Sequence, residues 1–361
     1  MKKLQIGLIG AGNMARAHTR CLLAAHQDDM EIVAMADPTE SETVKTLDLL
    51  KEAPPPVFAE YREMLNQVDL DAVIVAIPND LHAEASIAAM ESGKHVLCEK
   101  PIATRVEDAA RMAEVSEQTG RMLMIGFEYR YCSYVHRLRE IVQTRLGRLV
   151  SMWCREFRHP FQTKVGNWIQ DSRRSGGTLN EKMCHHFDVL NWMAGAPPAR
   201  VAAFGGNDVI HVINTPDEAM DNAWVVIEYA NGVRAMVGVC MFAPYKMDRR
   251  HEFGFIGDRG ILEGNDDLYE AVLWLRETEA DAAMRKRNSA PYPKSESVTW
   301  RMAQNPDDQG EWGLAAEAAE FVACVRDGRA PISQISSVLD SIRVSLAAEQ
   351  SIREGRMITV A

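Results

Sequence analysis

The sequence has no long apolar run and no excess of basic residues, and each absence excludes a class of protein. None of its apolar stretches approaches the roughly 20 residues that span a bilayer. Lys and Arg number 40 against 51 Asp and Glu, which gives a formal net charge of -11 at pH 7. Nucleic acids and anionic membrane surfaces are bound by clustered cations, so we expect neither as a partner.

Paired cysteines are also missing. The seven cysteines are scattered without a Cys-x-x-Cys pair, which is typical of thiols in a reducing compartment. The N-terminal stretch "MKKLQIGLIGAGNMA" has the basic start and apolar run of a signal peptide. The run is short, however, and it breaks into glycines with no cleavage-site pattern. We interpret it as a first strand and expect a cytoplasmic protein.

The chain of 361 residues is longer than one hydrophobic core usually supports, and its composition (47% hydrophobic, 25% charged) is that of an ordinary soluble enzyme. We therefore expect two domains, residues 1–126 and 127–361. The first begins with "LQIGLIGAGNMARAHTRCLLAA", in which Gly10, Gly12 and Ala15 form a GxGxxA pattern between a strand and a helix. This pattern predicts a dinucleotide site, with the diphosphate on the free amides at the helix start, next to Asn13 and Met14.

A second strand, "EIVAMADP", ends on Asp37 at the distance where a carboxylate accepts the ribose hydroxyls of a dinucleotide. No Lys or Arg follows Asp37 closely, so NAD is favoured over NADP. A capping or turn role for Asp37 is the alternative. Strands and helices then alternate as far as residue 129, which predicts a doubly wound parallel α/β sheet with its ligand at the carboxyl ends of the strands. The polar residues at these ends are Asn13, Asp37, Pro78, Asn79, Asp80, Glu99, Lys100, Glu128, Tyr129 and Arg130.

The second domain has a different order of predicted elements, in which apolar strands follow one another without intervening helices. The Asn231-Gly232 pair is a strong hairpin signal between two of these strands. We predict an α+β domain with a large open, mostly antiparallel sheet, closed by two C-terminal helices that each end at a glycine. One sheet face exposes Trp224 and Val226, which favours a homodimer or homotetramer formed through that face.

The segment "EKMCHHFDVLNWMAG", residues 181–195, places ionisable side chains on a core-like helix. Glu181, His185 and Asp188 have the spacing of one helix face, so Glu181 is expected to orient His185 as a proton acceptor. A metal site is the first alternative, but no HExxH pattern supplies the ligands. Cys184 as a nucleophile is the second, and a buried inert thiol is the simpler interpretation. A polar edge on a core helix is the third.

Residues 157–177 precede this helix and carry Arg158, His159, Lys164, Trp168, Arg173 and Arg174. We expect this loop to cover the substrate and cofactor. Its cations are suited to a carboxylate, a phosphate or hydroxyl groups, and of these we favour hydroxyls.

The stretches "PNDLH", "CEKPIA", "GFEYRY" and "SGGTLNEKMCHHFD" together resemble the glucose-fructose oxidoreductase/inositol dehydrogenase (Gfo/Idh/MocA) family over essentially the whole chain. The resemblance implies that Lys100 reaches into the substrate site, that Glu181 and His185 are the catalytic acid and histidine, and that Trp168 lies beside the cofactor. Glu181 stands where the family usually has Asp, and Met183 where it usually has a small Gly, which indicates a reshaped substrate pocket.

These patterns together predict an NAD-dependent oxidoreductase that acts on a secondary hydroxyl of a sugar, glycoside or cyclic polyol, with His185 as base. The alternatives are an enzyme that retains NAD and uses transient oxidation for elimination or epimerisation, and a dinucleotide-sensing regulator without turnover. The predicted cofactor residues are Gly10, Gly12, Asn13, Met14, Asp37, Pro78, Asn79, His82, Glu99, Lys100 and Trp168. The predicted substrate residues are Lys100, Arg130, His159, Glu181, His185 and His186.

Overall fold

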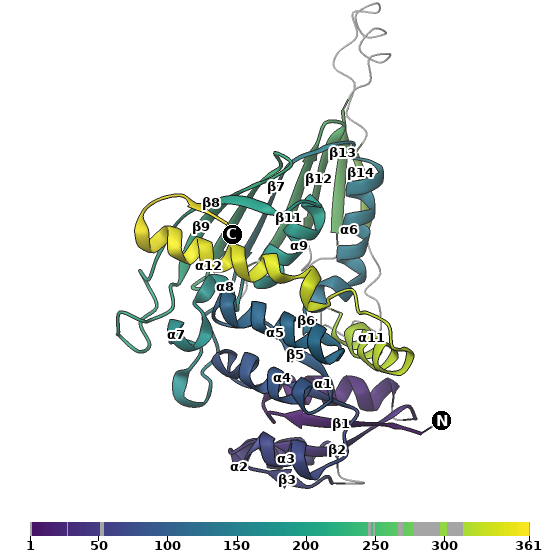
Figure 1. Cartoon of the computed structure of the whole chain (residues 1–361). Coiled ribbons are helices and arrows are strands. Elements are labelled where there is room, and N and C mark those ends of the chain that lie inside the picture. Colours follow the sequence, from purple (N-terminus) through teal and green to yellow (C-terminus); the bar gives the residue numbers. More distant parts are fainter. Residues whose placement is uncertain are drawn as a thin grey trace, which may run out of the picture.

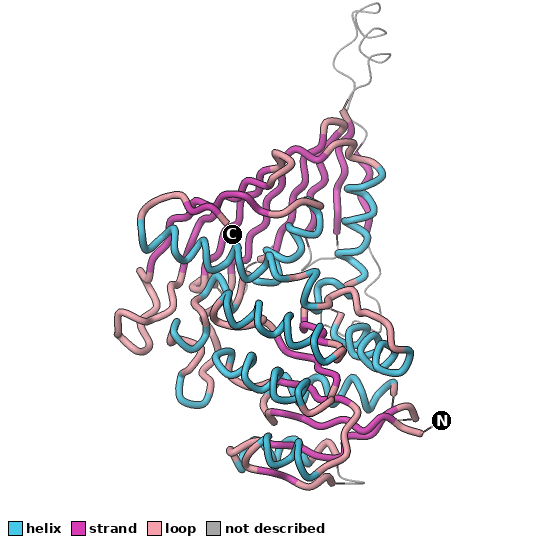
Figure 2. Tube along the Cα trace, in the orientation of Figure 1, coloured by secondary structure: helices cyan, strands magenta, loops and turns pink. Residues whose placement is uncertain are grey.

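The computed structural model describes residues 2–26, 28–50, 54–244, 247, 250–265, 270–276, 297–301 and 313–360. Two sheets and the helices packed on them form two layered halves (Figures 1 and 2). None of the helices in these ranges combines the length and the apolarity needed to cross a membrane.

The first half contains a six-stranded sheet in the order β3-β2-β1-β4-β5-β6, and each strand pair in it is parallel. The predicted doubly wound parallel sheet is therefore confirmed. Strand β4 shows why it forms, because all four of its residues are buried, as expected for a strand covered on both faces. Its strands are β1 (Leu4–Ile9), β2 (Met30–Ala36), β3 (Val57–Phe58), β4 (Ala72–Val75), β5 (His95–Glu99) and β6 (Leu123–Gly126). The helices are α1 (Asn13–Ala25), α2 (Glu40–Leu47), α3 (Tyr61–Gln67), α4 (His82–Glu91) and α5 (Val106–Thr119).

The second half contains a nine-stranded sheet in the order β14-β13-β12-β11-β7-β10-β9-β8-β15. Its pairs are antiparallel except for β7 and β10, which run parallel, so the expected open, mostly antiparallel sheet is confirmed. The run from residue 251 to 265 is two strands, β11 and β12, paired as a hairpin. The strands are β7 (Leu149–Phe157), β8 (Pro198–Gly206), β9 (Asn222–Tyr229), β10 (Arg234–Cys240), β11 (His251–Gly257), β12 (Gly260–Asn265), β13 (Glu270–Leu275), β14 (Ser297–Arg301) and β15 (Ile358–Thr359).

Helices cover one face of this sheet and leave the other open (Figure 1). Inward-facing residues alternate along β7 as Met152, Cys154 and Glu156, and all three are buried. On the other face Phe204 and Trp224 are 81% and 48% exposed and are direct cross-strand partners. The helices that follow the parallel sheet in the chain are α6 (Ser133–Thr144), α7 (Ser172–Ser175), α8 (Thr178–Glu181), α9 (Cys184–Ala194), α11 (Leu314–Asp327) and α12 (Leu339–Glu354).

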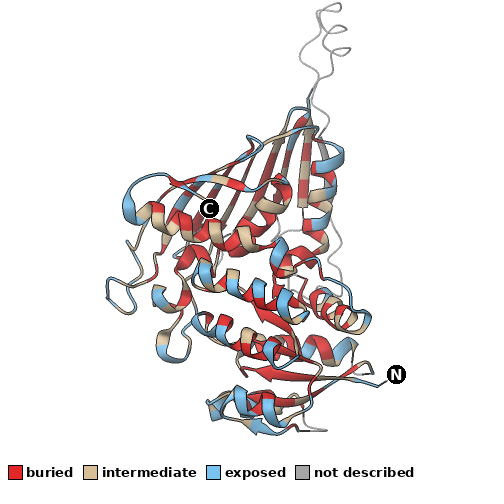
Figure 3. Cartoon of the chain, in the orientation of Figure 1, coloured by how far each residue is buried: buried red, intermediate tan, exposed pale blue. Residues whose placement is uncertain are grey.

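The last two helices connect the halves. Helix α11 packs on α1, and α12 contacts β8, α9 and α5 as it crosses the junction, in yellow in Figure 1. Figure 3 shows buried segments in both sheets and in the helices packed on them. Ile335, Val338 and Ile342 belong to the same buried cluster as residues of the strands β4 and β5. The core of the parallel-sheet half is therefore completed by residues from the end of the chain.

Candidate active site

The glycine turn after β1 has the shape that a dinucleotide requires. Gly10 has a φ of 100°, and a Cβ there would lie 2.3 Å from the carbonyl oxygen of Ala76, so only glycine fits. Gly12 caps α1 without a side-chain hydrogen bond, and a Cβ on it would meet no described heavy atom within 4 Å beyond its chain neighbours. Open space above uncapped helix amides fits a bound diphosphate. The amides belong to the first turn of α1, which starts with Asn13 and Met14.

Asp37, at the end of β2, lies against this turn. Its carboxylate accepts a hydrogen bond of 2.8 Å from the Ala11 backbone N–H and one of 2.7 Å from that of Thr39. These bonds fix the Asp37 carboxylate beside the glycine turn, which is where the sequence predicts a carboxylate that binds the ribose hydroxyls. Arg16 is the nearest cation, and its guanidinium is tied to Glu42 at 2.8 Å and to the Ala11 carbonyl oxygen.

Two of the predicted residues around 78–82, Asn79 and His82, form hydrogen bonds with backbone carbonyl oxygens. Asn79 follows Pro78 and donates to the carbonyl oxygen of Ser175 at 2.9 Å, which fastens α7 to the parallel-sheet half. His82 is 1% exposed, and its two ring nitrogens lie 2.8 and 3.0 Å from the carbonyl oxygens of Pro101 and Ile77. In this structure Asn79 and His82 therefore position backbone, and their contact with cofactor stays a prediction.

Glu99 has a partner that the sequence analysis missed. Its carboxylate lies 2.7 Å from His18 Nε2, and both side chains are buried. Burial opposes the charge of Glu99, but the hydrogen bond and charge of His18, together with Lys100 and His82, outweigh burial and lower the pKa of the carboxyl. His18 lies on the inward face of α1, 81 residues away, and no local pattern pairs the two residues.

Lys100 joins the two halves at the site. Its Nζ donates to the Glu181 carboxylate at 3.1 Å and to the Glu181 carbonyl oxygen at 2.9 Å. Burial works most strongly against the charged ammonium, yet Glu181, Cys184 and Glu99 together outweigh burial and raise the pKa of Lys100 above its ordinary value. Beside this pair, Asn180 is fully buried and donates to the carbonyl oxygen of Ala103 while accepting from Ser345.

The prediction that Glu181, His185 and Asp188 share one face of a single helix is wrong. Helix α8 ends at Glu181 and α9 begins at Cys184, so the segment is two helices rather than one. Glu181 pairs with Lys100, and Asp188 accepts two hydrogen bonds, at 2.7 and 2.9 Å, from Arg130. Arg130 also donates to the carbonyl oxygens of Ile332 and Ser337 and is 5% exposed, so the structure gives it a structural role instead of the predicted substrate contact.

His185 lies in an aromatic pocket. Its ring stacks on Tyr129 with centroids 4.8 Å apart and meets Phe127 edge-on. Its Nε2 lies 3.9 Å from Glu128 Oε1, while its Nδ1 has no hydrogen-bond partner in the described part of the chain. Burial, and then the charges of Lys100 and Lys182, lower the pKa of His185 well below its usual value. The imidazole is therefore neutral at physiological pH and able to accept a proton.

The two neighbours of His185 are less suited to chemistry. Burial raises the pKa of the Cys184 thiol to about 12, which supports the inert interpretation. His186 is 1% exposed, stacks on Phe253 at 5.6 Å and has a pKa lowered by burial to about 3. Contact between His186 and substrate stays a prediction. Among the described residues, no three His, Cys, Asp or Glu side chains gather as metal ligands.

A buried carboxylate next to His186 was also missed. Glu156 is fully buried, and its Oε1 lies 3.1 Å from Lys182 Nζ, 3.1 Å from His251 Nε2 and 3.2 Å from Arg158 Nη1. Burial opposes its charge, but Lys182, His251 and His186 together outweigh burial and lower the pKa of Glu156 well below its usual value. The signal was present, because Glu156 continues the inward row of Met152 and Cys154 in β7.

The loop 157–177 lies over this region and is fastened to the parallel-sheet half by Arg174, whose Nε donates to Asp80 at 3.1 Å. Trp168 is half-buried at the end of a short 3-10 turn, Val165–Asn167. Burial and the charge of Arg158 lower the pKa of His159. The contacts of Trp168 with cofactor and of His159 with substrate stay predictions.

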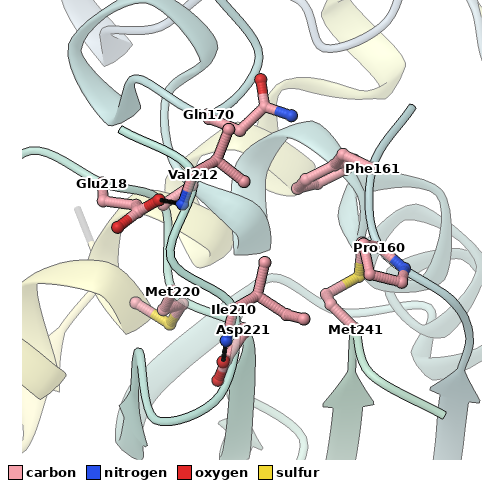
Figure 4. A pocket seen from close by; sticks show the side chains of 10 residues that line it. Pro160, Phe161, Gln170, Ile210, Val212, Glu218, Met220, Asp221 and Met241 are labelled. Carbon is pink, nitrogen blue, oxygen red and sulfur yellow. Dashed lines mark hydrogen bonds between the residues drawn. The ribbon is translucent and has the colours of Figure 1, made fainter. Parts of the chain in front are cut away.

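A small recess lies in the same loop region (Figure 4). The two carboxylates that line it accept hydrogen bonds from backbone N–H groups. Glu218 accepts from the N–H of Val212, and Asp221 accepts from the N–H of Ile210. The recess includes none of the predicted site residues. It is lined by Pro160, Phe161, Gln170, Ile210, Val212, Glu218, Ala219, Met220, Asp221 and Met241.

Comparison with known families and proteins agrees with this geometry. Residues 4–127 match a family described as oxidoreductase, NAD-binding Rossmann fold, and residues 139–360 match its C-terminal alpha/beta domain. The chain is 25% identical over 369 residues to an inositol 2-dehydrogenase of Rhizobium meliloti, covering 99% of each protein. It is 26% identical over 266 residues to a levoglucosan dehydrogenase of Pseudarthrobacter phenanthrenivorans, covering 64% of this chain and 66% of that protein.

Among solved structures, a levoglucosan dehydrogenase in complex with NADH and levoglucosan superposes with a TM-score of 0.83. The two chains are 20% identical, and the match covers 99% of this chain and 100% of the other. At this identity the superposition shows a shared fold.

Proposed function

The chain belongs to the Gfo/Idh/MocA family of oxidoreductases, and from this premise we propose that it oxidises a secondary hydroxyl of a sugar, glycoside or cyclic polyol, with NAD as its cofactor. Relatives named inositol 2-dehydrogenase and levoglucosan dehydrogenase support this substrate class. The observation that carries the proposal is the Lys100–Glu181 pair, which joins the parallel-sheet half to the segment that bears His185.

The residues of this chain fit NAD at the glycine turn. The first-turn amides of α1 hold the diphosphate, and Asp37 accepts the ribose hydroxyls while excluding a 2'-phosphate. When bound, NAD accepts the hydride that leaves the carbinol carbon.

The protein supplies the proton transfer and the electrostatics. Neutral His185 accepts the hydroxyl proton at one of its ring nitrogens. Lys100 donates a hydrogen bond to the same substrate oxygen and stabilises the negative charge that develops on it. Glu181 keeps Lys100 charged and in place, instead of orienting His185 as the spacing had predicted.

The two alternatives make different demands on these residues. An enzyme that retains NAD for elimination or epimerisation uses the same residues but releases no net NADH. A dinucleotide-sensing regulator needs neither an ion-paired lysine nor a buried neutral histidine at the substrate position, so Lys100 and His185 favour catalysis.

The test is absorbance at 340 nm while inositols, free sugars, sugar acids and glycosides are screened with NAD. Substrate-dependent NADH is expected, and His185→Ala is expected to lower the rate by about 100-fold or more. The control is His211→Ala, since the His211 side chain is 50% exposed on another loop. NADH production that is unchanged in His185→Ala would remove His185 as the base.

Two further expectations concern the setting of the enzyme. All seven cysteines are free thiols, which supports a reducing, cytoplasmic location. The exposed apolar face of the large sheet supports a homodimer or homotetramer.

A further inference from the structure

Two cations beside the site share a single carboxylate. The charge of Lys100 is offset by that of Glu181. Lys182 and Arg158 both lie on Glu156, which is the one carboxylate within ion-pair distance of either cation in the described part of the chain. Partly buried charges are normally paired, so two cations on a single carboxylate leave one positive charge uncompensated.

The arrangement of this group directs its cations toward the outside. Glu156 is fully buried, whereas the side chains of Lys182 and Arg158 are 17% and 22% exposed. A single oxygen of Glu156, Oε1, contacts Lys182, Arg158 and His251, so the carboxylate anchors the cationic groups from behind. The cations are therefore the part of this group that solvent reaches, while Glu156 is out of its reach.

This group is adjacent to the proposed catalytic residues. Lys182 follows Glu181 directly in the chain, and His186 Nε2 lies 3.7 Å from Glu156 Oε2. After burial, Lys100 and Lys182 are the two largest influences that lower the pKa of His185, which fits a ring flanked by both ammonium groups. The cations on Glu156 are thus neighbours of the residues proposed to hold the reacting hydroxyl.

We propose that Lys182 and Arg158 bind a carboxylate carried by the sugar substrate, so that the enzyme acts on an acidic sugar such as a uronate in preference to its neutral counterpart. This inference rests on the dehydrogenase activity proposed above and narrows its substrate class. Ammonium and guanidinium groups form charge-assisted hydrogen bonds with carboxylate and phosphate oxygens alike. One uncompensated positive charge matches the single charge of a carboxylate rather than the near-double charge of a phosphate ester. This proposal differs from the hydroxyl recognition that the sequence favoured for the loop.

The test compares matched substrates that differ in their charge. Steady-state kinetics with NAD would compare glucuronate with glucose and galacturonate with galactose, with glucose 6-phosphate as the phosphate arm. The measured quantity is the ratio of kcat/KM for each acid to that for its neutral partner. The wild-type ratio is expected to exceed about ten, because a hydrogen bond to a charged group contributes roughly one to two orders of magnitude in binding.

Variants assign the preference to the two cations. Lys182→Met and Arg158→Met are each expected to lower the acid-to-neutral ratio about tenfold or more, mainly through KM for the acid. Lys182→Arg, which keeps the charge, is expected to restore most of the ratio. The control Lys3→Met removes an exposed cation far from the site and should leave the ratio as it is.

Three results would overturn the proposal. They are a wild-type enzyme that prefers the neutral sugar, a ratio that is the same in Lys182→Met, and a preference for glucose 6-phosphate over the uronates. If no sugar yields NADH, the proposed function fails, and calorimetry of glucuronate binding to the NADH-loaded protein decides the anion site separately. Binding that weakens in Lys182→Met supports the site, while absent or equal binding refutes it.

Discussion

The Lys100 ammonium donates to two oxygens of one residue, the carboxylate and the backbone carbonyl of Glu181, at 3.1 and 2.9 Å. The Lys100 side chain, which comes from the first half of the molecule, is thereby fixed at the end of α8 in the second half. This pair helps to keep Lys100 protonated, because Glu181 is the largest of the influences that together raise its pKa against the effect of burial.

Glu181→Gln is therefore expected to shift the alkaline limit of activity. Without the carboxylate charge, the pKa of Lys100 falls, and the proton that it donates to the substrate oxygen is lost at a lower pH. The alkaline limb of kcat/KM should move down by at least about one pH unit. A pH–rate profile measures this, with Glu107→Gln as the control, since that side chain is 77% exposed. A limb that does not move would show that Glu181 has no influence on the proton of Lys100.

The acidic limit of activity reports on His185. Its pKa is lowered by burial and by the charges of Lys100 and Lys182, so the neutral ring that accepts a proton persists below the usual histidine range. We expect kcat/KM for alcohol oxidation to reach half its maximum below pH 6.5. The same profile in His211→Ala should coincide with that of the wild type. A half-maximum at or above pH 6.5 would contradict the environment described for His185.

The parts of the fold that were predictable depend on neighbours in sequence. The turn through Gly10 and Gly12 has a local pattern, and the strand–helix alternation of the first half needs only hydrophobic periodicity. The partner of Glu181 was predicted wrongly, because the spacing to His185 assumed one continuous helix. Instead, α8 ends at Glu181 and α9 begins at Cys184, and nothing in the local sequence marks this break.

Contacts between distant elements were beyond the sequence patterns. Arg130 and Asp188 are separated by 58 residues, and their pairing follows from how the helices pack. The surroundings of Glu156 depend on the register of β7 against β11, which sets His251 opposite Glu156. A strand pattern states that a residue points inward but not which charges it meets there.

Asp37 is expected to determine the choice of cofactor. Its carboxylate beside the glycine turn opposes a 2'-phosphate, so Asp37→Ser should lower kcat/KM for NAD and raise the ratio of NADP to NAD use about tenfold or more. Initial rates with each cofactor measure this, with Asp69→Ser on the exposed surface of the same half as the control. An unchanged ratio would leave Asp37 with the alternative role of fixing the turn.

Asn180 is expected to contribute to stability. It is fully buried, and its amide donates to the Ala103 carbonyl oxygen and accepts from Ser345. Asn180→Ala removes both of these buried hydrogen bonds, so the free energy of unfolding should fall by about 1–3 kcal/mol, although Ser345 keeps its bond to the Ile342 carbonyl oxygen. Chemical denaturation measures the change, and Asn66→Ala on the exposed side of α3 is the control. Equal losses in the two variants would contradict a special role for Asn180.

The open face of the large sheet is expected to form an interface between copies of the chain. Phe204 and Trp224 form one cross-strand pair on it, and Val226 and Met236 form the next. Phe204→Lys should shift the mass measured by light scattering from a dimer or tetramer toward a monomer, while Val44→Lys on α2 should not. A wild-type protein with the mass of a single chain would refute this interface.

The burial of Ile335, Val338 and Ile342 against β4 and β5 bears on how the enzyme can be assembled and engineered. During synthesis the strands of the first half are made before the helices at the end of the chain. Until those helices are made, the apolar residues of the sheet that they cover stay exposed. A truncated fragment of the first 126 residues is accordingly prone to aggregate. Chimeras that exchange cofactor preference between relatives will fold best when the terminal helices travel with the N-terminal half.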